Sequence, residues 1–188
     1  ATTGGAVWAG TDQGLFRFDG RRWRHVLGGA LSPAPGAYRT VVAVGEDDVW
    51  AVDLRTGVLW HHTAGGWATP PRAGRLAARV TAAALAADGT LWVGTDTGLT
   101  RLHGDAWLDV GPAQRVDGVT VAPDGTVWFG SAHTLVHLDG NHVLSTAYSP
   151  DQGLNTLAVG PEGDVWATGT GFSEGVGPKR LHDGAVGA

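Results

Sequence analysis

Short apolar runs separated by polar turns recur along the chain, and segment 88–110 shows this pattern most clearly. Asp88-Gly89 is a dipeptide typical of a tight turn with positive φ. The run LWVG at 91–94 is short and apolar, as expected of a strand that is buried on both faces. Two further strands are predicted at 99–102 and 106–110, each preceded by a polar turn. The segment therefore predicts three short strands joined by tight turns.

The same unit occurs five times, and a tryptophan marks its second strand each time. The intervals between these tryptophans are 42, 42, 36 and 38 residues: Trp8, Trp50, Trp92, Trp128 and Trp166. A period near 40 with about four short strands per unit is typical of the blades of a β-propeller. A plain β-sandwich with fortuitous tryptophan spacing is the alternative, but the turns recur together with the tryptophans.

We therefore predict an all-β fold, a β-propeller of five four-stranded blade units in a single domain, 1–188. The strands of a blade are called a to d from the inside outwards. The predicted blade units are 1–27, 38–69, 79–110, 118–147 and 154–188.

The two ends of this repeat series look incomplete. The first unit offers no good inner strand, and the last one stops before a convincing outer strand. An open end would leave a strand edge and an apolar blade face in water. Either a short segment such as 185–188 adds to an end blade, or the chain is part of a larger propeller, or a second copy completes it. We favour missing neighbouring blades or self-association over a self-contained five-blade ring.

Residue types within the units suit a structural role. The tryptophan of each second strand can fill the space between neighbouring blades, where an aromatic side chain buries on the order of 150–250 Å². Gly10, Gly94 and Gly130 follow these tryptophans closely, because a bulkier residue would obstruct packing. His137 stands at the repeat position of Arg17 and Arg101, which indicates a repeated structural role such as hydrogen bonding between blades.

Composition excludes several classes of function. The chain has no cysteine, so disulfides, thiolate metal sites and a cysteine nucleophile are absent. A formal net charge of −5 and an isoelectric point near 5.8 argue against nucleic-acid and anionic-membrane partners. No apolar run approaches the roughly 20 residues that a membrane helix needs, so no membrane insertion is expected.

The repeats also resemble known families. GTLWVGTDTGL at 89–99 and AVWAGTDQGL at 6–15 resemble the two-component-regulator propeller repeat. That family occurs in extracytoplasmic sensor parts of bacterial hybrid histidine kinases, often in glycan sensing. DVWAVD at 48–53, followed by GVLW at 57–60, looks more like the repeat of tectonin-type propeller lectins. The resemblance implies a blade and an extracellular or periplasmic location, and it carries no catalytic residues.

Candidate binding residues fall in the d–a and b–c connections. The a–b and c–d turns are mostly short and stereotyped, whereas the d–a and b–c connections vary, and variation on a constant scaffold is where binding residues usually lie. Aromatic rings beside carboxylates and arginine suit a sugar, which needs stacking faces and bidentate hydrogen bonds. The predicted ligand-binding residues are Tyr38, Arg55, Asp96, His133, Tyr148, Asp151, Phe172 and Glu174. A solvated loop face without a ligand is the alternative.

No metal, cofactor or catalytic set is predicted. His61 and His62 are adjacent on a strand and should point to opposite faces, so they cannot easily chelate one ion. His133 and His137 lack the glutamate of a zincin pattern. The chain has no Gly-x-Ser-x-Gly elbow, P-loop or dinucleotide fingerprint. A carboxylate pair for glycoside hydrolysis stays open, because it depends on a separation that sequence does not give.

These observations predict a non-catalytic ligand-binding or sensory module that recognises a glycan or protein partner on the face carrying the d–a and b–c loops. One alternative is a tectonin-like lectin with repeated sugar sites, which repeat-equivalent polar residues would favour. The other is a propeller lyase resembling the streptogramin lyases, whose repeats also carry Val-Trp-Phe. An asymmetric cluster of histidines and carboxylates in the channel would favour the lyase.

Overall fold

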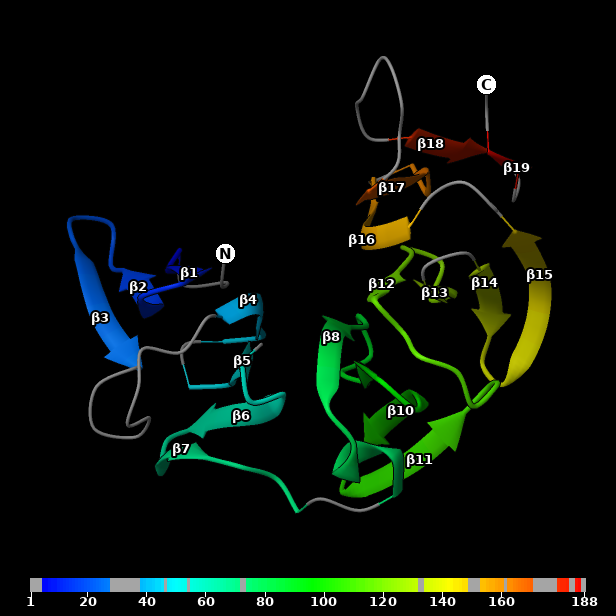
Figure 1. Ribbon diagram of the computed structural model, residues 1–188. Coiled ribbons are helices and arrows are strands. Elements are labelled where there is room, and N and C mark those ends of the chain that lie inside the picture. The colour runs from blue at the N-terminus through cyan, green and yellow to red at the C-terminus, as the bar shows by residue number, and fades with distance from the viewer. Residues whose placement is uncertain are drawn as a thin grey trace. The chain divides into compact units, whose positions relative to one another are not determined.

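A computed structural model of the chain describes residues 5–27, 38–45, 47–53, 55–71, 74–131, 134–148, 153–160, 162–170, 179–182 and 185–186. The chain divides into two compact units, Ala1–Arg72 and Ala73–Ala188. Each unit consists of small antiparallel sheets whose strands follow the chain order (Figure 1). No helix among the described residues is long and apolar enough to cross a membrane.

The first unit contains two sheets, joined by the segment 28–37. The first sheet consists of β1 (Val7–Thr11), β2 (Gly14–Phe18) and β3 (Trp23–Leu27). The second consists of β4 (Tyr38–Ala43), β5 (Val49–Asp53), β6 (Val58–Thr63) and β7 (Gly66–Ala68). The first sheet thus has three strands among the described residues, and β1 takes the place of a second strand, as the sequence indicated.

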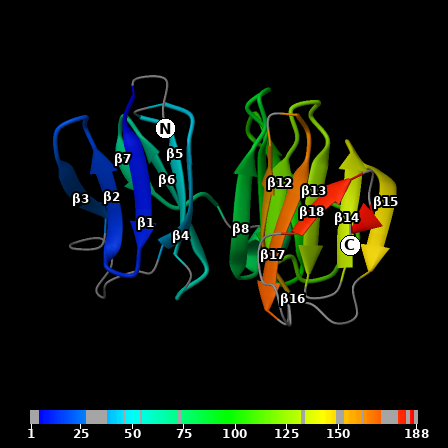
Figure 2. The ribbon, with the colours of Figure 1, turned by 90° about the horizontal axis from the view of Figure 1, so that it is seen from above.

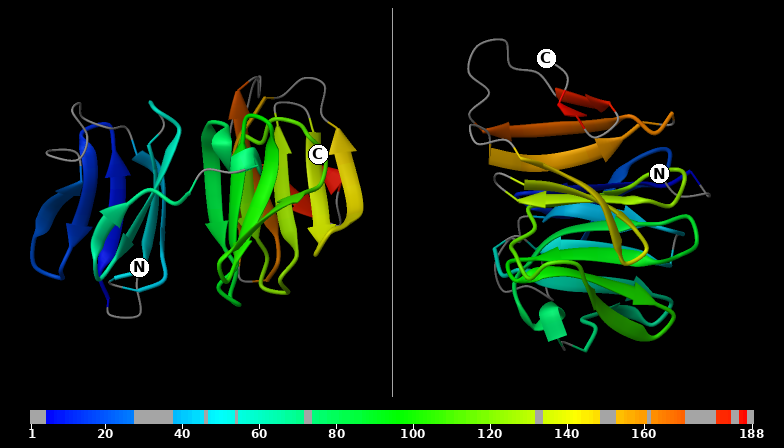
Figure 3. Two further views of the ribbon diagram at one scale, coloured as in Figure 1. Left: turned by 90° about the horizontal axis from the view of Figure 1, so that it is seen from below. Right: turned by 90° about the vertical axis from the view of Figure 1, so that its right-hand side faces the viewer.

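The second unit begins with a short 3₁₀ helix, η1 (Gly74–Ala77), and contains three four-stranded sheets. The sheets stack face to face (Figures 2 and 3). Their strands are β8 (Val80–Leu85), β9 (Leu91–Thr95), β10 (Gly98–His103) and β11 (Ala106–Val110); β12 (Gly118–Val121), β13 (Val127–Ser131), β14 (Thr134–Asp139) and β15 (His142–Tyr148); and β16 (Gly153–Val159), β17 (Val165–Thr170), β18 (Lys179–His182) and β19 (Ala185–Val186). The outer strand missing from the sequence pattern is therefore the two-residue β19, paired with β18.

Antiparallel register places a cationic or imidazole side chain opposite the marker tryptophan in every sheet. Arg17 lies over Trp8 with its Cζ 6.0 Å from the ring centre, and Arg101 lies 5.5 Å from that of Trp92. His61 stacks on Trp50 at 3.6 Å between ring centres, and His137 stacks on Trp128 at 3.9 Å. In the fifth sheet, register places Arg180 opposite Trp166. His137 thus shares a repeated structural role with Arg17 and Arg101, as predicted, but the contact is ring stacking within one sheet and not the expected hydrogen bond between blades. A cation over an aromatic face contributes about 0.5–2 kcal/mol.

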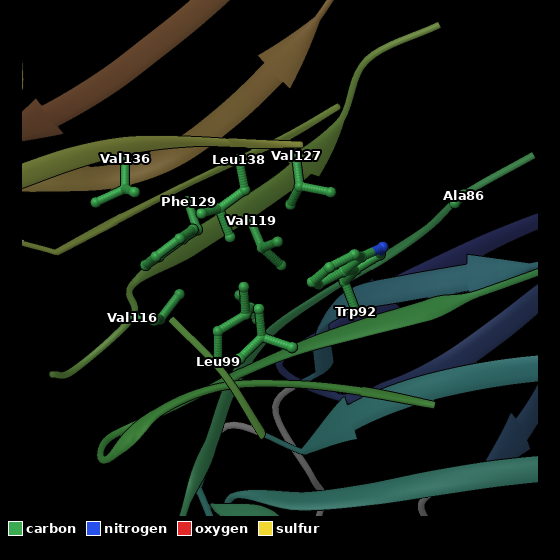
Figure 4. Close-up of a cluster of buried hydrophobic side chains, with 11 residues drawn as sticks. Ala86, Trp92, Leu99, Val116, Val119, Val127, Phe129, Val136 and Leu138 are labelled. Atoms are coloured by element: carbon green, nitrogen blue, oxygen red, sulfur yellow. The ribbon is translucent and has the colours of Figure 1, made fainter. Parts of the chain in front are cut away.

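The core of the second unit lies between consecutive sheets. Trp92, Leu99 and Val110 of the β8–β11 sheet share one cluster with Val127 and Phe129 of the β12–β15 sheet, and all are nearly inaccessible to solvent (Figure 4). The next contact repeats this arrangement: Trp128 and Leu135 share a cluster with Leu157, Val165 and Ala167 of the β16–β19 sheet. The tryptophan face of one sheet therefore packs on the Val-x-Phe or Val-x-Ala face of the following sheet.

The same arrangement holds in the first unit, and one glycine in each unit shows why small residues follow the tryptophans. Leu15 and Leu27 cluster with Tyr38 and Ala51, and Trp8 packs against them. A Cβ at Gly10 would meet the carbonyl oxygen of Tyr38 and lie 2.9 Å from its Cβ. In the second unit, a Cβ at Gly94 would lie 2.7 Å from Cγ1 of Val116. Both approaches are too close for any side chain.

Replacing Trp92 by alanine should lower the free energy of unfolding by about 3–5 kcal/mol, because a side chain that is 4% exposed leaves a cavity between two sheets. Chemical denaturation followed by circular dichroism measures this change. The matched control is Leu108→Ala in the same sheet, where the side chain is 48% exposed and the loss should stay below about 0.5 kcal/mol. Equal losses in the two variants would contradict the packing described here.

Candidate functional site

The turns between the second and third strands are built by the residue that ends the second strand. Thr11 Oγ1 donates to the carbonyl oxygen of Gly14 at 3.0 Å and accepts from the amide of Gln13 at 3.1 Å. Thr95 Oγ1 donates in the same way to Gly98 at 2.9 Å and accepts from the amide of Thr97 at 3.2 Å. The threonine hydroxyl thus bonds one backbone carbonyl and one backbone amide of its own turn. The next residues, Asp12 and Asp96 at the same repeat position, extend exposed side chains.

Asp53 performs this role in the β4–β7 sheet, where the turn is two residues longer. Its Oδ1 accepts from the amide of Arg55 at 2.9 Å, and its Oδ2 accepts from the hydroxyl of Thr56 at 2.8 Å. The carbonyl oxygen of Asp53 also accepts from the amide of Gly57 at 2.7 Å. Asp53 is 3% exposed, whereas Arg55 is exposed beside it. The buried carboxylate therefore fixes the turn that presents the predicted ligand-binding arginine.

Asp96, the second predicted site residue on such a turn, is held by Arg79, the residue just before β8. Its Oδ1 accepts from the amide of Arg79 at 3.1 Å, and its own amide donates to the carbonyl oxygen of Arg79 at 3.0 Å. The amide of Val116 in turn donates to the carbonyl oxygen of Thr95 at 2.9 Å. This turn is thus tied to the chain before and after its sheet, and a rigid backbone carries an exposed carboxylate.

Tyr38 lies in the core and not on an exposed loop. Its side chain is 2% exposed, and it packs with Leu15, Leu27 and Ala51. Register places it opposite Asp53, next to the turn that carries Arg55. Burial, together with the negative charge of Asp53, raises the pKa of Tyr38 to about 12. Its hydroxyl has no hydrogen-bond partner among the described residues. A ligand would have to reach Tyr38 at the end of the sheet, past this turn.

Of the five remaining predicted residues, only Tyr148 lies within the described part of the chain. The backbone of Tyr148 pairs with Thr134, so it lies at the same end of the β12–β15 sheet as the connection from β13 to β14. The remaining four lie outside the described residues: His133, Asp151, Phe172 and Glu174. The grouping of the predicted site residues therefore stays a prediction.

Turns at the opposite end of the sheets use their carboxylates on their own backbone. Asp88 accepts from the amide of Thr90 at 2.9 Å, and Asp124 accepts from that of Thr126 at 2.9 Å. Asp19 accepts from two amides, those of Arg21 and Arg22, each at 3.0 Å. These backbone hydrogen bonds hold the pKa of all three carboxyls below its usual value. Such carboxylates are structural and are poorly available to a ligand.

The histidine pair lies on opposite faces of β6, as the sequence predicted. His61 stacks on Trp50, and its Nε2 is 2.9 Å from Oδ1 of Asp48. His62 contacts Trp67, at 4.9 Å between ring centres, and lies near Trp8. Burial lowers the pKa of His137, the other imidazole that stacks on a marker tryptophan, against the opposing attraction of nearby aspartates. Within the described ranges, no group of three or more histidine, cysteine, aspartate or glutamate residues could hold a metal ion.

These sheets, with their turns and contacts, define a β-propeller fold, and the chain resembles solved propeller structures. No family model and no curated protein matches it. Virginiamycin B lyase from Staphylococcus aureus is similar with a TM-score of 0.72 and 16% identity over 96% of this chain and 64% of the lyase. The chain thus spans less than two thirds of that structure. At this identity, the likeness shows the fold alone.

Two other similar structures differ in their described roles. The extracellular domain of a putative one-component system from B. thetaiotaomicron has a TM-score of 0.68 and 16% identity, over 89% of this chain and 24% of that chain. A putative gluconolactonase has a TM-score of 0.68 and 18% identity, over 90% of this chain and 69% of that chain. Lyase, sensor and lactonase-like structures therefore share this fold, so function has to be argued from the site.

Tyr38→Phe should leave stability at pH 7 unchanged or slightly raised, because it removes a buried hydroxyl that has no partner among the described residues. Tyr38 has its folded pKa raised from 10 to about 12. Its contribution to stability is therefore complete below pH 10 and is lost as pH rises through 12. Thermal melts between pH 8 and 12 should show that the phenylalanine variant loses less stability in this range than the parent. Identical pH dependence in the two proteins would contradict the assigned environment.

Proposed function

We propose that the chain is a non-catalytic ligand-binding or sensory module that recognises a glycan or protein partner through its b–c and d–a loops. The observation that carries the proposal is the construction of the b–c turns. The side chains of Thr11, Asp53 and Thr95 form hydrogen bonds with backbone groups of their own turns, and exposed polar side chains follow them. A rigid turn lowers the entropic cost of ordering its side chains when a ligand binds.

The charges on these turns suit a polar ligand. Exposed Asp12 and Asp96 offer carboxylate acceptors for sugar hydroxyls, and exposed Arg55 offers a planar set of donors. At the opposite end of the sheets, Asp19, Asp88 and Asp124 each accept an amide hydrogen of their own turn, whereas Asp96 accepts one amide hydrogen from Arg79, outside its turn. This difference favours the b–c end of the sheets as the ligand-binding end.

The location that we propose is extracellular or periplasmic. Extracellular domains of putative one-component and hybrid two-component systems from B. thetaiotaomicron are among the structures with a similar fold. A glycan or a protein outside the cell is the kind of ligand that such a location makes available to a sensory module.

A tectonin-like lectin with repeated sugar sites is the second candidate. Asp12 and Asp96 occupy the same position in the same kind of turn, and each follows a threonine that makes the same pair of hydrogen bonds. Repeat-equivalent exposed side chains are the feature that repeated sites require. The number of ligands bound per chain separates the two candidates.

A glycan array on the purified chain, followed by calorimetric titration with the best-binding glycan, tests the proposal. Asp12→Asn and Asp96→Asn should weaken binding about tenfold or more, because a charge-assisted hydrogen bond contributes roughly 1.5–3 kcal/mol. Tyr148→Ala and Phe172→Ala should also weaken binding with little loss of stability. One ligand per chain supports a sensory module, and two or more equivalent ligands support the lectin.

The matched control is Asp105→Asn, an exposed aspartate on a turn at the opposite end of the sheet that carries Asp96. Its affinity for the glycan should equal that of the parent. If the control loses affinity while Asp12→Asn and Asp96→Asn retain it, the ligand binds at the other end of the sheets. If no glycan binds, the sugar-binding form of the proposal is wrong.

A further inference from the structure

The contact between the two sheets of the first unit differs from its counterpart in the second unit at two positions of the third strand. Trp60 and His62 of β6 lie on the face that meets the first sheet, since Trp60 pairs with Ala51 of the buried cluster and His62 is two residues further along the strand. The same positions of the β12–β15 sheet hold Val136 and Leu138, which are buried in an apolar cluster (Figure 4). Nitrogen-bearing rings therefore replace aliphatic side chains in the first unit.

Two tryptophans from neighbouring strands complete a cluster of rings in this contact. The ring centre of His62 is 4.9 Å from that of Trp67 in β7 and 6.4 Å from that of Trp8 in β1. The ring centres of Trp8 and Trp67 are 6.3 Å apart. Trp60 packs against the same buried residues as Trp8 and Trp67. The contacts of this indole–imidazole cluster, Trp8, Trp60, His62 and Trp67, lie wholly within the first unit.

Every ring of the cluster buries a nitrogen that has no hydrogen-bond partner among the described residues. These atoms are Nε1 of Trp8, Trp60 and Trp67, and Nδ1 of His62. An indole nitrogen can only donate, and Nδ1 of His62 donates in the tautomer, or the imidazolium, that protonates it. A buried N–H group without an acceptor destabilises a protein, and most such groups in folded proteins are paired. Four of them in one contact point to a bound group that brings acceptor atoms.

Charges on the facing surfaces favour an anion as this group. Register places Arg17 opposite Trp8 and Arg24 opposite Arg17, so the three form a row on the face that meets the second sheet. The Arg17 Cζ atom is 6.0 Å from the centre of the Trp8 ring. Asp19 is engaged with Arg24 at 3.2 Å, and both carboxylate oxygens of Asp53 on the facing sheet accept hydrogen bonds within their own turn. Arg17 therefore adds a positive charge beside the buried donors.

We propose that the contact between the first two sheets binds an oxyanion, a carboxylate or sulfate group, through the N–H donors of the indole–imidazole cluster. Hydrogen bonds from such donors are strengthened when the acceptor is charged. The four nitrogens are inaccessible to solvent while their side chains are half-buried, so the rings have to turn to admit the anion, which is then enclosed between the sheets. Trp67 directly follows the β6–β7 turn, at the end of the sheet opposite the Arg55 turn. The site is thus separate from the proposed ligand-binding loops and does not rest on them.

Titration of the chain with sodium acetate and with sodium sulfate at constant ionic strength, followed by the indole N–H signals in heteronuclear NMR spectra, tests the proposal. Trp8→Phe, Trp60→Phe and Trp67→Phe each remove one signal and thereby assign it. These three signals of the parent should shift saturably with a Kd of about 1–10 mM, as expected for so small a ligand. Acetamide, which has a similar shape and no charge, should bind about tenfold more weakly or less. The two salts distinguish a carboxylate site from a sulfate site.

Two variants and a matched control locate the anion. His62→Leu, which introduces the residue of the β12–β15 sheet, and Trp67→Phe, which keeps an aromatic ring, should each weaken binding about tenfold, because each removes one donor to a charged acceptor. Trp23→Phe should retain the parent's affinity, because register places Trp23 beside Phe18 on the opposite face of the first sheet. Melting curves establish that the variants fold, and Trp67→Phe carries the test if His62→Leu does not.

Two results would overturn the proposal. In the first, the three indole signals do not shift with either salt, or they shift equally with acetamide. In the second, His62→Leu and Trp67→Phe bind the anion as tightly as the parent, which would place it outside the cluster.

Discussion

Packing of a tryptophan face on the next sheet is the interaction on which the rest of this structure depends. A small antiparallel sheet cannot bury its apolar residues by itself, so each blade depends on its neighbours. The tryptophan is the largest side chain in each described contact, and an arginine or histidine stands opposite it in the neighbouring strand. Gly10 and Gly94 leave room for the chain of the adjoining segment. Loss of one such contact would expose apolar surface on two sheets.

This packing leaves the ends of the sheets free to differ. At one end, Asp88 and Asp124 satisfy their own turns, and the hydrogen bonds lower the pKa of their carboxyls. At the other end, the side chains of Thr11, Asp53 and Thr95 bond the backbone of their turns, and exposed residues follow them. Structural demands are thus met by a few side chains at the turns, and other exposed positions can change without loss of the blade. A fold shared by lyase, sensor and lactonase-like structures is consistent with this separation.

Much of the fold could be predicted from the sequence, because the tryptophan period and the turn dipeptides are local signals. The five repeats and the three-stranded first sheet were predicted in this way, and His137 was placed with Arg17 and Arg101. β19 was harder to predict, since two residues carry no periodicity. Tyr38 was expected on a loop face, but it is buried under Leu15 and Leu27 of the first sheet. This contact joins residues of two different sheets, so no local signal in the sequence shows it. Asp53 was missed as the residue that fixes the Arg55 turn, although an aspartate followed closely by Thr-Gly is a recognisable turn signal.

A double-mutant cycle across the contact between the β8–β11 and β12–β15 sheets tests the central claim most directly. Trp92 and Val127 belong to one buried cluster but to different sheets (Figure 4). The free energies of unfolding of Trp92→Ala, Val127→Ala and the double variant give their coupling. We expect a coupling of about 1 kcal/mol, within the range found for residues in contact. Losses that add to within about 0.3 kcal/mol would show that the two sheets do not depend on each other, and would contradict this account.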